Sequence, residues 1–362
     1  HPAVFLPAGL LLCSIMSLAI GTSWGTVGTI GVILIGVGDA MGIPLPLVAG
    51  MVVSGASFGD KLSPVSDTTN LAAVTAGTDL YKHINSMLYT TVPTYIICII
   101  FFTIMGLEYS TGTVPTQQIF DFQQAIESQF TISMWGFLPL IILFSLSLKK
   151  ISAEPAMVAS IISAIIIAML LQDRNILDIL NSLQEGYKIK TDHEGLNILL
   201  NRGGIQSMMW TLSLSLIALA LGGILEGFGF LEALLKGILV KIKRAATLML
   251  TTVLTGILSC LSMGETYIAI IVSNQLFKKK YEELHLQKYL LSRVVEESTT
   301  LITPLIPWTT TGAFYYGALG VPVLDYQAWA LLNYLNPILS IILAYMGFGI
   351  FRLKQNEKID ER

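Results

Sequence analysis

Runs of apolar residues long enough to cross a lipid bilayer recur along this chain of 362 residues. A transmembrane helix needs about 20 predominantly apolar residues, and the runs at 87–107, 156–171, 208–225 and 329–351 reach or approach that length. Charged residues make up only 12% of the chain, whereas an ordinary soluble domain has about 25%. The sequence therefore predicts an all-α polytopic membrane protein.

One polar segment, residues 55–70, interrupts these apolar runs. It reads GASFGDKLSPVSDTTN and holds Asp60, Lys61, Asp67 and Asn70, with Pro64 between them. A soluble protein would place such a segment in a surface loop. Within a membrane, ionisable residues are costly enough that they mark a functional site. We therefore expect unwound backbone that faces a water-filled site, since irregular backbone at membrane depth needs such cover.

Two parts of the sequence echo each other in order. Residues 13–35 resemble 258–274, residues 63–74 resemble 295–308, and one more apolar run follows each pair. Sixteen of the 21 basic residues lie in clusters at 149–150, 236–244, 278–293 and 352–362 and at Lys82, which predicts that these parts are cytoplasmic. The first hairpin, with its turn at 20–26, would then open outward, and the second, 245–277, would be re-entrant with its turn near 260–266. This pattern is typical of inverted-repeat secondary transporters whose site lies at the membrane midplane. We therefore expect residues 55–70 and 294–308 to approach each other near the midplane.

The predicted organisation has four parts. Residues 1–107 form the C-terminal part of a first inverted repeat, and residues 108–131 form a connector. Residues 132–352 form the second repeat, in which 172–207 lies along the outer interface as amphipathic helices, and residues 353–362 form a cytoplasmic tail. The chain starts at His1 without a Met or a signal peptide, so we expect that its true start is missing.

The candidate site is a set of carboxylate, hydroxyl and amide oxygens, the ligands that a hard cation prefers. We predict Asp67 as the principal Na⁺ ligand and proton acceptor, and Glu265 or Glu297 as a second titrating acid. The further oxygen ligands are predicted at Ser66, Thr68, Thr69, Asn70, Ser298, Thr299 and Thr300, and the supporting residues at Asp60, Lys61, Gly21, Thr22 and Ser23. A carboxylate that holds either a proton or Na⁺ exchanges them when it is exposed alternately to the two sides.

Structural interpretations of the same residues stay open. Asp60 and Lys61 can pair with each other or with their surroundings to hold the unwound segment, and Asp67 can serve as a helix cap. Arg293 precedes Glu296 and Glu297 by one helical turn, so it can form an ordinary interfacial ion pair with them. Glycines 21, 25, 28 and 31 suit helix packing and bending.

Other functions are less well supported by the residues. Lys61 could contact an organic anion, which keeps an organic-acid exchanger as the alternative function. A channel does not explain paired hairpins, and no nucleophile, metal or cofactor motif indicates an enzyme. The three cysteines lie within apolar runs as small buried residues. The expected partners are Na⁺, H⁺ and lipid without nucleic acid or cofactor, and a homodimer is left open.

Four stretches carry a family resemblance: GTSWGTVGTIG, SGASFGDKLSPVSDTTNLAA, GETYIAI and SRVVEESTTLITPLIPWTTTGAFYYGALGVP. They resemble the NhaC-type Na⁺/H⁺ antiporter family of bacteria, across nearly the whole chain. The resemblance implies a multi-pass protein of the bacterial cell (inner) membrane that expels Na⁺ in exchange for H⁺. Some relatives exchange malate and lactate instead. Where the family commonly has a Glu-Asp-Ser-Gly-Thr pattern, this chain has EESTT at 296–300.

Overall fold

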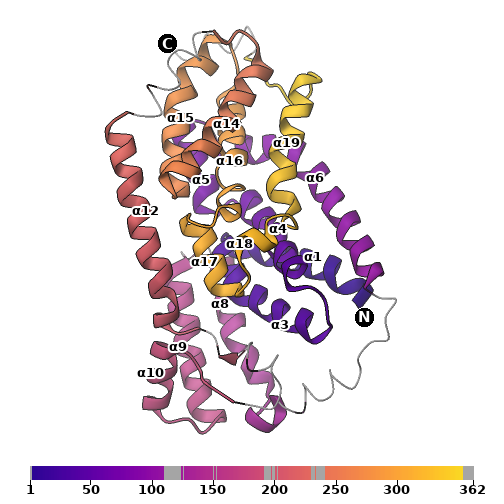
Figure 1. Cartoon of the computed structure of the whole chain (residues 1–362), viewed down its shortest axis with the longest axis vertical. Helices are drawn as coiled ribbons and strands as arrows, with labels where there is room; N and C mark the ends of the chain where they lie inside the picture. Colours follow the sequence, from indigo (N-terminus) through magenta and orange to yellow (C-terminus); the bar gives the residue numbers. More distant parts are fainter. Residues whose placement is uncertain are drawn as a thin grey trace. The chain divides into compact units, whose positions relative to one another are not determined.

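The computed structural model describes residues 2–109, 126–149, 153–190, 203–229 and 241–353, with a few single positions between these ranges. All regular elements in these ranges are helices (Figure 1), apart from one isolated bridge between Leu286 and Arg352. The predicted all-α class is confirmed. Most of the predicted connector and all but the first residue of the predicted tail lie outside the described residues.

Five of the described helical segments are long and apolar enough to cross a membrane: Ala3–Ile20, Ser23–Ala40, Leu80–Glu108, Ile205–Leu225 and Ala245–Met263. Shorter apolar helices lie at Met134–Leu143, Pro155–Leu171 and Leu331–Tyr345. The four predicted spans fall on these helices, and the last one is shorter than predicted because its helix ends at Tyr345. The chain is therefore a multi-span membrane protein.

The chain divides into two compact units. The first unit comprises His1–Asp60, Ile99–Ser213 and Phe314–Ala330, and the second comprises Lys61–Cys98, Leu214–Ala313 and Leu331–Arg362. Each unit thus takes segments from both predicted repeats. The boundaries of the repeats, and their relation by inversion, stay predictions.

The first unit contains the helices α1 (Pro2–Ile20), α2 (Ser23–Thr26), η1 (Val27–Gly31), α3 (Val32–Ala40), most of α4 (Leu45–Leu62), η2 (Met134–Phe137), α8 (Leu138–Leu148), α9 (Ala153–Leu171), α10 (Ile176–Glu185), η3 (Ile205–Met208) and α18 (Val323–Tyr326). Between α1 and α2 the chain turns at Gly21, whose φ is +78°, a conformation that glycine adopts without a steric penalty. The helix break predicted within 20–26 is present. α10 lies within 172–207, where an amphipathic helix was predicted.

The second unit contains α5 (Asp67–Ala76), the first part of α6 (Leu80–Glu108), most of α12 (Met209–Gly227), α14 (Ala245–Met263), α15 (Thr266–Glu283), α16 (Lys288–Ser298) and α19 (Leu331–Tyr345). Helices α5, α14, α15 and α16 pack against one another (Figure 1). Their shared core includes Leu248, Val253, Phe277, Leu290, Val294 and Val295. This core fixes α16, which carries most of the buried charge of the unit.

Helical structure is interrupted in both predicted regions, but the first interruption is shorter than the predicted unwound segment 55–70, because residues 55–62 belong to α4 and residues 67–70 to α5. α4 ends at Leu62 and α5 begins at Asp67, and Ser66 caps α5 by accepting a hydrogen bond from the Thr69 amide at 3.4 Å. α16 ends at Ser298, and a short 3₁₀ turn, η4 (Thr303–Leu305), precedes α17 (Thr310–Leu319). The Leu301 carbonyl in this gap accepts a hydrogen bond from Asn333 at 2.8 Å. The Asn333 side chain thus supplies the hydrogen bond that a backbone amide would supply to this carbonyl in a continuous helix.

The predicted turn near 260–266 is also present. α14 ends at Gly264, whose φ of +66° is in the left-handed region, as is common at helix C-termini. Glu265 then caps α15, because its carboxylate accepts from the amides of Tyr267 at 2.5 Å and Ile268 at 3.1 Å. The Thr310 amide at the start of α17 donates to the Gly264 carbonyl at 2.8 Å. Two interrupted regions therefore meet in the second unit.

Candidate functional site

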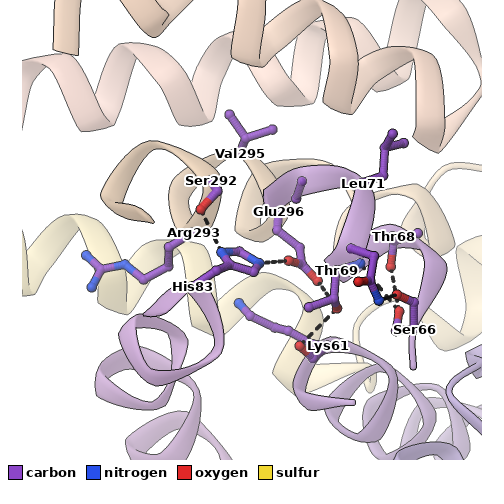
Figure 2. Close-up of polar contacts among 12 residues, drawn as sticks. Lys61, Ser66, Thr68, Thr69, Leu71, His83, Ser292, Arg293, Val295 and Glu296 are labelled. Carbon is purple, nitrogen blue, oxygen red and sulfur yellow. Dashed lines mark hydrogen bonds and ion pairs between the residues drawn. The ribbon is translucent and has the colours of Figure 1, made fainter. Parts of the chain in front are cut away.

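Five ionisable side chains gather inside the second unit: Lys61, His83, Arg293, Glu296 and Glu297, here called the charged cluster. All five are at most 1% exposed. They come from the end of α4, the start of α6 and the C-terminal half of α16. Figure 2 labels all of them except Glu297. Because an unpaired buried charge is strongly destabilising, the pairing of these groups decides what the cluster can do.

Helix α16 presents the cluster on two adjacent faces. Ser292 and Glu296 are four residues apart, as are Arg293 and Glu297, and residues at this spacing lie above one another on a helix. The two pairs are offset by one residue, which is about 100° of rotation around the helix axis. The sequence RVVEE therefore directs its two glutamates toward different partners.

Glu297 is surrounded by cations and a hydroxyl. Its Oε1 lies 3.5 Å from Lys61 Nζ and 3.9 Å from Arg293 Nε, and it accepts a hydrogen bond from the Thr90 hydroxyl. Lys61 also donates to Asn336 Oδ1 at 2.9 Å. The second oxygen, Glu297 Oε2, is buried without a hydrogen-bond partner among the described residues.

Glu296 is paired with histidine instead. Its Oε2 lies 2.5 Å from His83 Nε2, and its Oε1 lies 2.9 Å from the Thr69 hydroxyl. The other ring nitrogen, His83 Nδ1, lies 2.7 Å from the Ser292 hydroxyl. Figure 2 shows this row of contacts from Ser292 through His83 and Glu296 to Thr69.

Arg293 is held by the backbone as well as by Glu297. Its guanidinium donates to the carbonyls of Ser86 at 3.2 Å and Gly349 at 2.9 Å, and it lies over the ring of Phe351 at 5.5 Å. Arg293 ends the stretch of basic residues 278–293 that predicts a cytoplasmic location, but its side chain is 1% exposed and does not face an aqueous loop.

The residues predicted around Asp67 lie at the start of α5. Asp67 is exposed; it accepts from the Thr68 amide at 2.8 Å and from the Tyr267 hydroxyl. Asn70 donates to the carbonyls of Pro64 at 3.0 Å and Ser66 at 2.6 Å, so its amide closes the turn between α4 and α5. The Ser66 and Thr68 hydroxyls are 3.1 Å apart. Thr69 differs from these residues because it reaches the charged cluster.

The hydroxyls that follow Glu297 have separate surroundings. Ser298 and Thr299 both donate to the Val295 carbonyl, at 2.9 and 2.8 Å, which leaves their oxygens as acceptors. Thr300 Oγ1 is buried and has no hydrogen-bond partner among the described residues. Glu265 is occupied as the cap of α15, beside a group of hydroxyls in which Thr266 contacts Thr303 at 3.1 Å.

The supporting residues Gly21, Thr22, Ser23 and Asp60 belong to the first unit. There the Ser23 hydroxyl donates to Asp60 Oδ2 at 2.7 Å, and Asp60 is 4% exposed. Thr22 caps α2 by accepting from the Gly25 amide at 3.5 Å. Within its own unit, Asp60 therefore anchors the start of α2 to the end of α4.

His83 and Glu296 of the charged cluster, and the neighbouring Thr90 and Asn336, were not among the predicted site residues. The sequence carries a signal for His83 and Thr90: His83, Ser86, Thr90 and Thr94 recur at helical spacing on an otherwise apolar helix, and all four are buried. Asn333, Asn336 and Ser340 form a similar buried row on α19. Polar rows on apolar helices indicate a site inside the protein rather than a lipid-facing surface.

The described residues contain no group of three or more His, Cys, Asp or Glu side chains arranged to hold a metal ion. The charged cluster offers carboxylate oxygens together with hydroxyl and amide oxygens from neighbouring residues. Such a donor set suits a weakly bound, hard cation better than a resident transition metal.

Apolar spans, helices broken at two places and a buried cluster of charges together define a polytopic secondary transporter. Comparison of the sequence gives the family: the Na⁺/H⁺ antiporter family matches residues 1–69 and 55–348. The chain belongs to this family.

Three curated relatives are similar along nearly the whole chain. The Na⁺/H⁺ antiporter NhaC of Alkalihalophilus pseudofirmus is 39% identical over 96% of this chain and 75% of its own length. NhaC of Bacillus subtilis is 39% identical over 96% of this chain and 77% of its own length. The malate-2H⁺/Na⁺-lactate antiporter of Bacillus subtilis is 37% identical over 98% of this chain and 76% of its own length. No solved structure matches the chain.

Proposed function

We propose that the protein exchanges Na⁺ for H⁺ at the charged cluster, with Glu297 as the acid that binds Na⁺. The observation that carries this proposal is the pairing of Glu297. One carboxylate oxygen is satisfied by Lys61 and Thr90, and the other is buried without a hydrogen-bond partner among the described residues. A buried carboxylate oxygen that lacks a donor is a suitable ligand for a cation that leaves water.

Charge balance in the cluster explains why Na⁺ and H⁺ would be coupled. Lys61 and Arg293 offset Glu296 and Glu297, so the cluster is neutral when His83 is neutral. Bound Na⁺ adds one positive charge in a place where uncompensated charge is costly. The arrival of Na⁺ therefore favours the departure of a proton, and the arrival of a proton favours the departure of Na⁺.

Glu297 is a better candidate than Asp67 on geometry. Asp67 is exposed and accepts from the Thr68 amide in the first turn of α5, as acidic residues at helix N-termini commonly do. Asp67 as the principal Na⁺ ligand is the alternative that the transport test below decides, and Ser298, Thr299 and Thr300 are proposed as neutral ligands beside Glu297. The other predicted oxygens, at Ser66, Thr68 and Asn70, help to form the turn before α5.

The test is transport by the purified protein in proteoliposomes that contain a pH-sensitive dye. A Na⁺ gradient should drive proton movement in the wild type. Glu297→Gln should abolish this movement, because the amide has the shape of the carboxylate but lacks the negative charge that would balance Na⁺. Asp67→Asn is the comparison variant and should retain exchange. If Glu297→Gln exchanges at the wild-type rate while Asp67→Asn does not, Asp67 is the ion ligand and Glu297 is not.

Organic-acid exchange is the second candidate function. It is favoured by the similarity to the malate-2H⁺/Na⁺-lactate antiporter and by the cationic side chain of Lys61. However, Lys61 already contacts Glu297 and Asn336. The same proteoliposomes should therefore exchange Na⁺ for H⁺ without any organic anion. If radiolabelled malate or lactate is required inside or outside the vesicles, the second function is correct.

The cellular setting follows from the same proposal. We place the protein in the bacterial cell (inner) membrane with its C-terminus in the cytoplasm, where the basic residues 278–280 on α15 would also lie. Lipid surrounds the exposed apolar helices. The homodimer stays a prediction.

A further inference from the structure

Glu296 and Glu297 are adjacent in sequence, but their partners differ in chemistry. Glu297 faces Lys61 and Arg293, and arginine keeps its proton in proteins. Glu296 faces His83, and histidine is the side chain whose charge changes most readily near neutral pH. One glutamate is therefore surrounded by cationic side chains, and the other is paired with an imidazole.

We propose that His83 and Glu296 form a proton-binding site that is separate from the Na⁺ site at Glu297, and that this pair releases the proton when Na⁺ binds. The proposal rests on the function proposed above, which left open the group that releases the proton. Two observations support the His83–Glu296 pair as that group: the short contact between His83 and Glu296, and the hydroxyl groups at both ends of the pair.

The hydroxyl of Ser292 lies between two acceptors. Its Oγ is 2.7 Å from His83 Nδ1 and 3.2 Å from the Tyr289 carbonyl, and a hydroxyl has one proton to donate. When His83 is neutral with its proton on Nε2, Ser292 donates to Nδ1. When His83 is charged, Nδ1 donates to Ser292, whose proton turns to the Tyr289 carbonyl. The added proton therefore leaves no group without a partner.

The hydroxyl of Thr69 has the same property at the other end. Its Oγ1 is 2.9 Å from Glu296 Oε1 and 3.1 Å from the Lys61 carbonyl. Thr69 donates to an ionised Glu296, and it can instead donate to the carbonyl when Glu296 is protonated and donates to Thr69. The pair can thus accept one proton on either residue, with one hydroxyl rotating and no hydrogen bond lost.

Other charged groups near the pair explain why Na⁺ would expel this proton. Lys61 from α4 and Arg293 and Glu297 from α16 interact electrostatically with one another, and Lys61 also interacts with Glu296. Tyr281 of α15 is a neighbour of Arg293 and Glu297. A proton on the pair and Na⁺ at Glu297 would each raise the charge of the cluster by one, so occupying both at once is unfavourable.

The experiment measures proton release and Na⁺ binding separately, without transport. Purified protein in weakly buffered detergent solution receives NaCl, while a pH indicator reports protons and ²²Na⁺ binding is measured in parallel. Choline chloride is the salt control. At a pH where the pair holds its proton before Na⁺ is added, the wild type should release about one proton per Na⁺ bound, because binding of the two cations is mutually exclusive. Removing the imidazole with His83→Gln should leave Na⁺ bound and reduce proton release at least fivefold.

Two further variants keep the test decisive. His285→Gln makes the same chemical change at an exposed histidine outside the cluster and should release protons like the wild type. Ser292→Ala keeps both members of the pair but removes the hydroxyl that accepts a hydrogen bond from charged His83, so it should reduce proton release. This variant provides the test if His83→Gln does not fold.

The possible failures are distinguishable. If the wild type binds no ²²Na⁺, the proposed function fails. If His83→Gln and Ser292→Ala both bind Na⁺ and still release a full proton, the proposed function stands but the His83–Glu296 assignment is overturned. Lys61 then becomes the source of the released proton. If Glu297→Gln binds Na⁺ as the wild type does, the position of the Na⁺ site is wrong.

Discussion

Lys61 illustrates how one buried side chain can serve both stability and transport. Its ammonium group lies 3.5 Å from Glu297 Oε1 and donates to Asn336, and both members of the ion pair are 0% exposed. Removing one partner of a buried pair leaves the other charge uncompensated, whereas removing both can cost little. Stability and exchange should therefore respond differently to single and double substitutions.

We expect Lys61→Met to lower the free energy of unfolding by about 3 kcal/mol, because Glu297 loses its nearest cation. The double variant Lys61→Met with Glu297→Gln should recover most of this loss but not Na⁺/H⁺ exchange. Thermal unfolding of the purified variants in detergent measures the stabilities, and proteoliposome assays measure exchange. A double variant no more stable than Lys61→Met would show that the ion pair is not the source of the loss.

At the level of helices, α14 and α16 approach each other closely at a glycine. A Cβ atom placed on Gly256 would lie 2.1 Å from Ser298 Oγ and 2.6 Å from Ser298 Cβ, distances shorter than atoms tolerate. Ser298 directly follows Glu297. The glycine therefore fixes the distance between α14 and the end of the helix that carries the proposed Na⁺ ligand.

Gly256→Ala should destabilise the protein by about 1–3 kcal/mol, because the added methyl group overpacks this contact. Adding Ser298→Gly to the same chain should relieve the contact and restore part of the stability. Gly223→Ala on α12 is the matched control, since a Cβ there meets no atom within 4 Å. Thermal unfolding in the absence of Na⁺ tests all three; equal effects of Gly256→Ala and Gly223→Ala would contradict the packing interpretation.

The helices show what sequence patterns could and could not predict. Apolar runs gave the spans, and prolines with clustered polar residues gave the breaks at 63–66 and 299–309. We also expected 55–70 and 294–308 to approach each other, and the contacts of Thr69 with Glu296 and of Lys61 with Glu297 confirm this for residues 61–70. The partner His83 was missed because the span was taken to begin at residue 87, beyond it. Which distant helix supplies a partner depends on tertiary packing, which periodicity within one helix does not report.

For the molecule as a whole, ion binding and folding stability are linked. A ligand that binds only the folded state raises the free energy of unfolding, by about 2.7 kcal/mol when its concentration is 100 times its dissociation constant. Na⁺ bound at the charged cluster, as proposed above, would be such a ligand. Protons bound by the cluster oppose it, so the stabilisation depends on pH.

We predict that Na⁺ raises the thermal unfolding temperature of the wild type at alkaline pH, and that the rise becomes smaller as the pH falls. The sign follows from competition: at lower pH the cluster holds an extra proton, which Na⁺ must displace. K⁺ at the same ionic strength is the control, and Glu297→Gln should lose the Na⁺-specific rise. An increase in the Na⁺ effect on acidification would contradict mutually exclusive binding.

The one-residue offset on α16 has a consequence for classifying related proteins. Residues 296 and 297 are both glutamate, yet the first contacts a histidine and the second contacts a lysine. In a multiple alignment, a gap misplaced by one column would exchange these two roles without lowering the apparent similarity. A relative that keeps only one of the two acids should therefore be assigned by whether it retains the histidine of α6 or the lysine of α4, rather than by the count of acids in the motif.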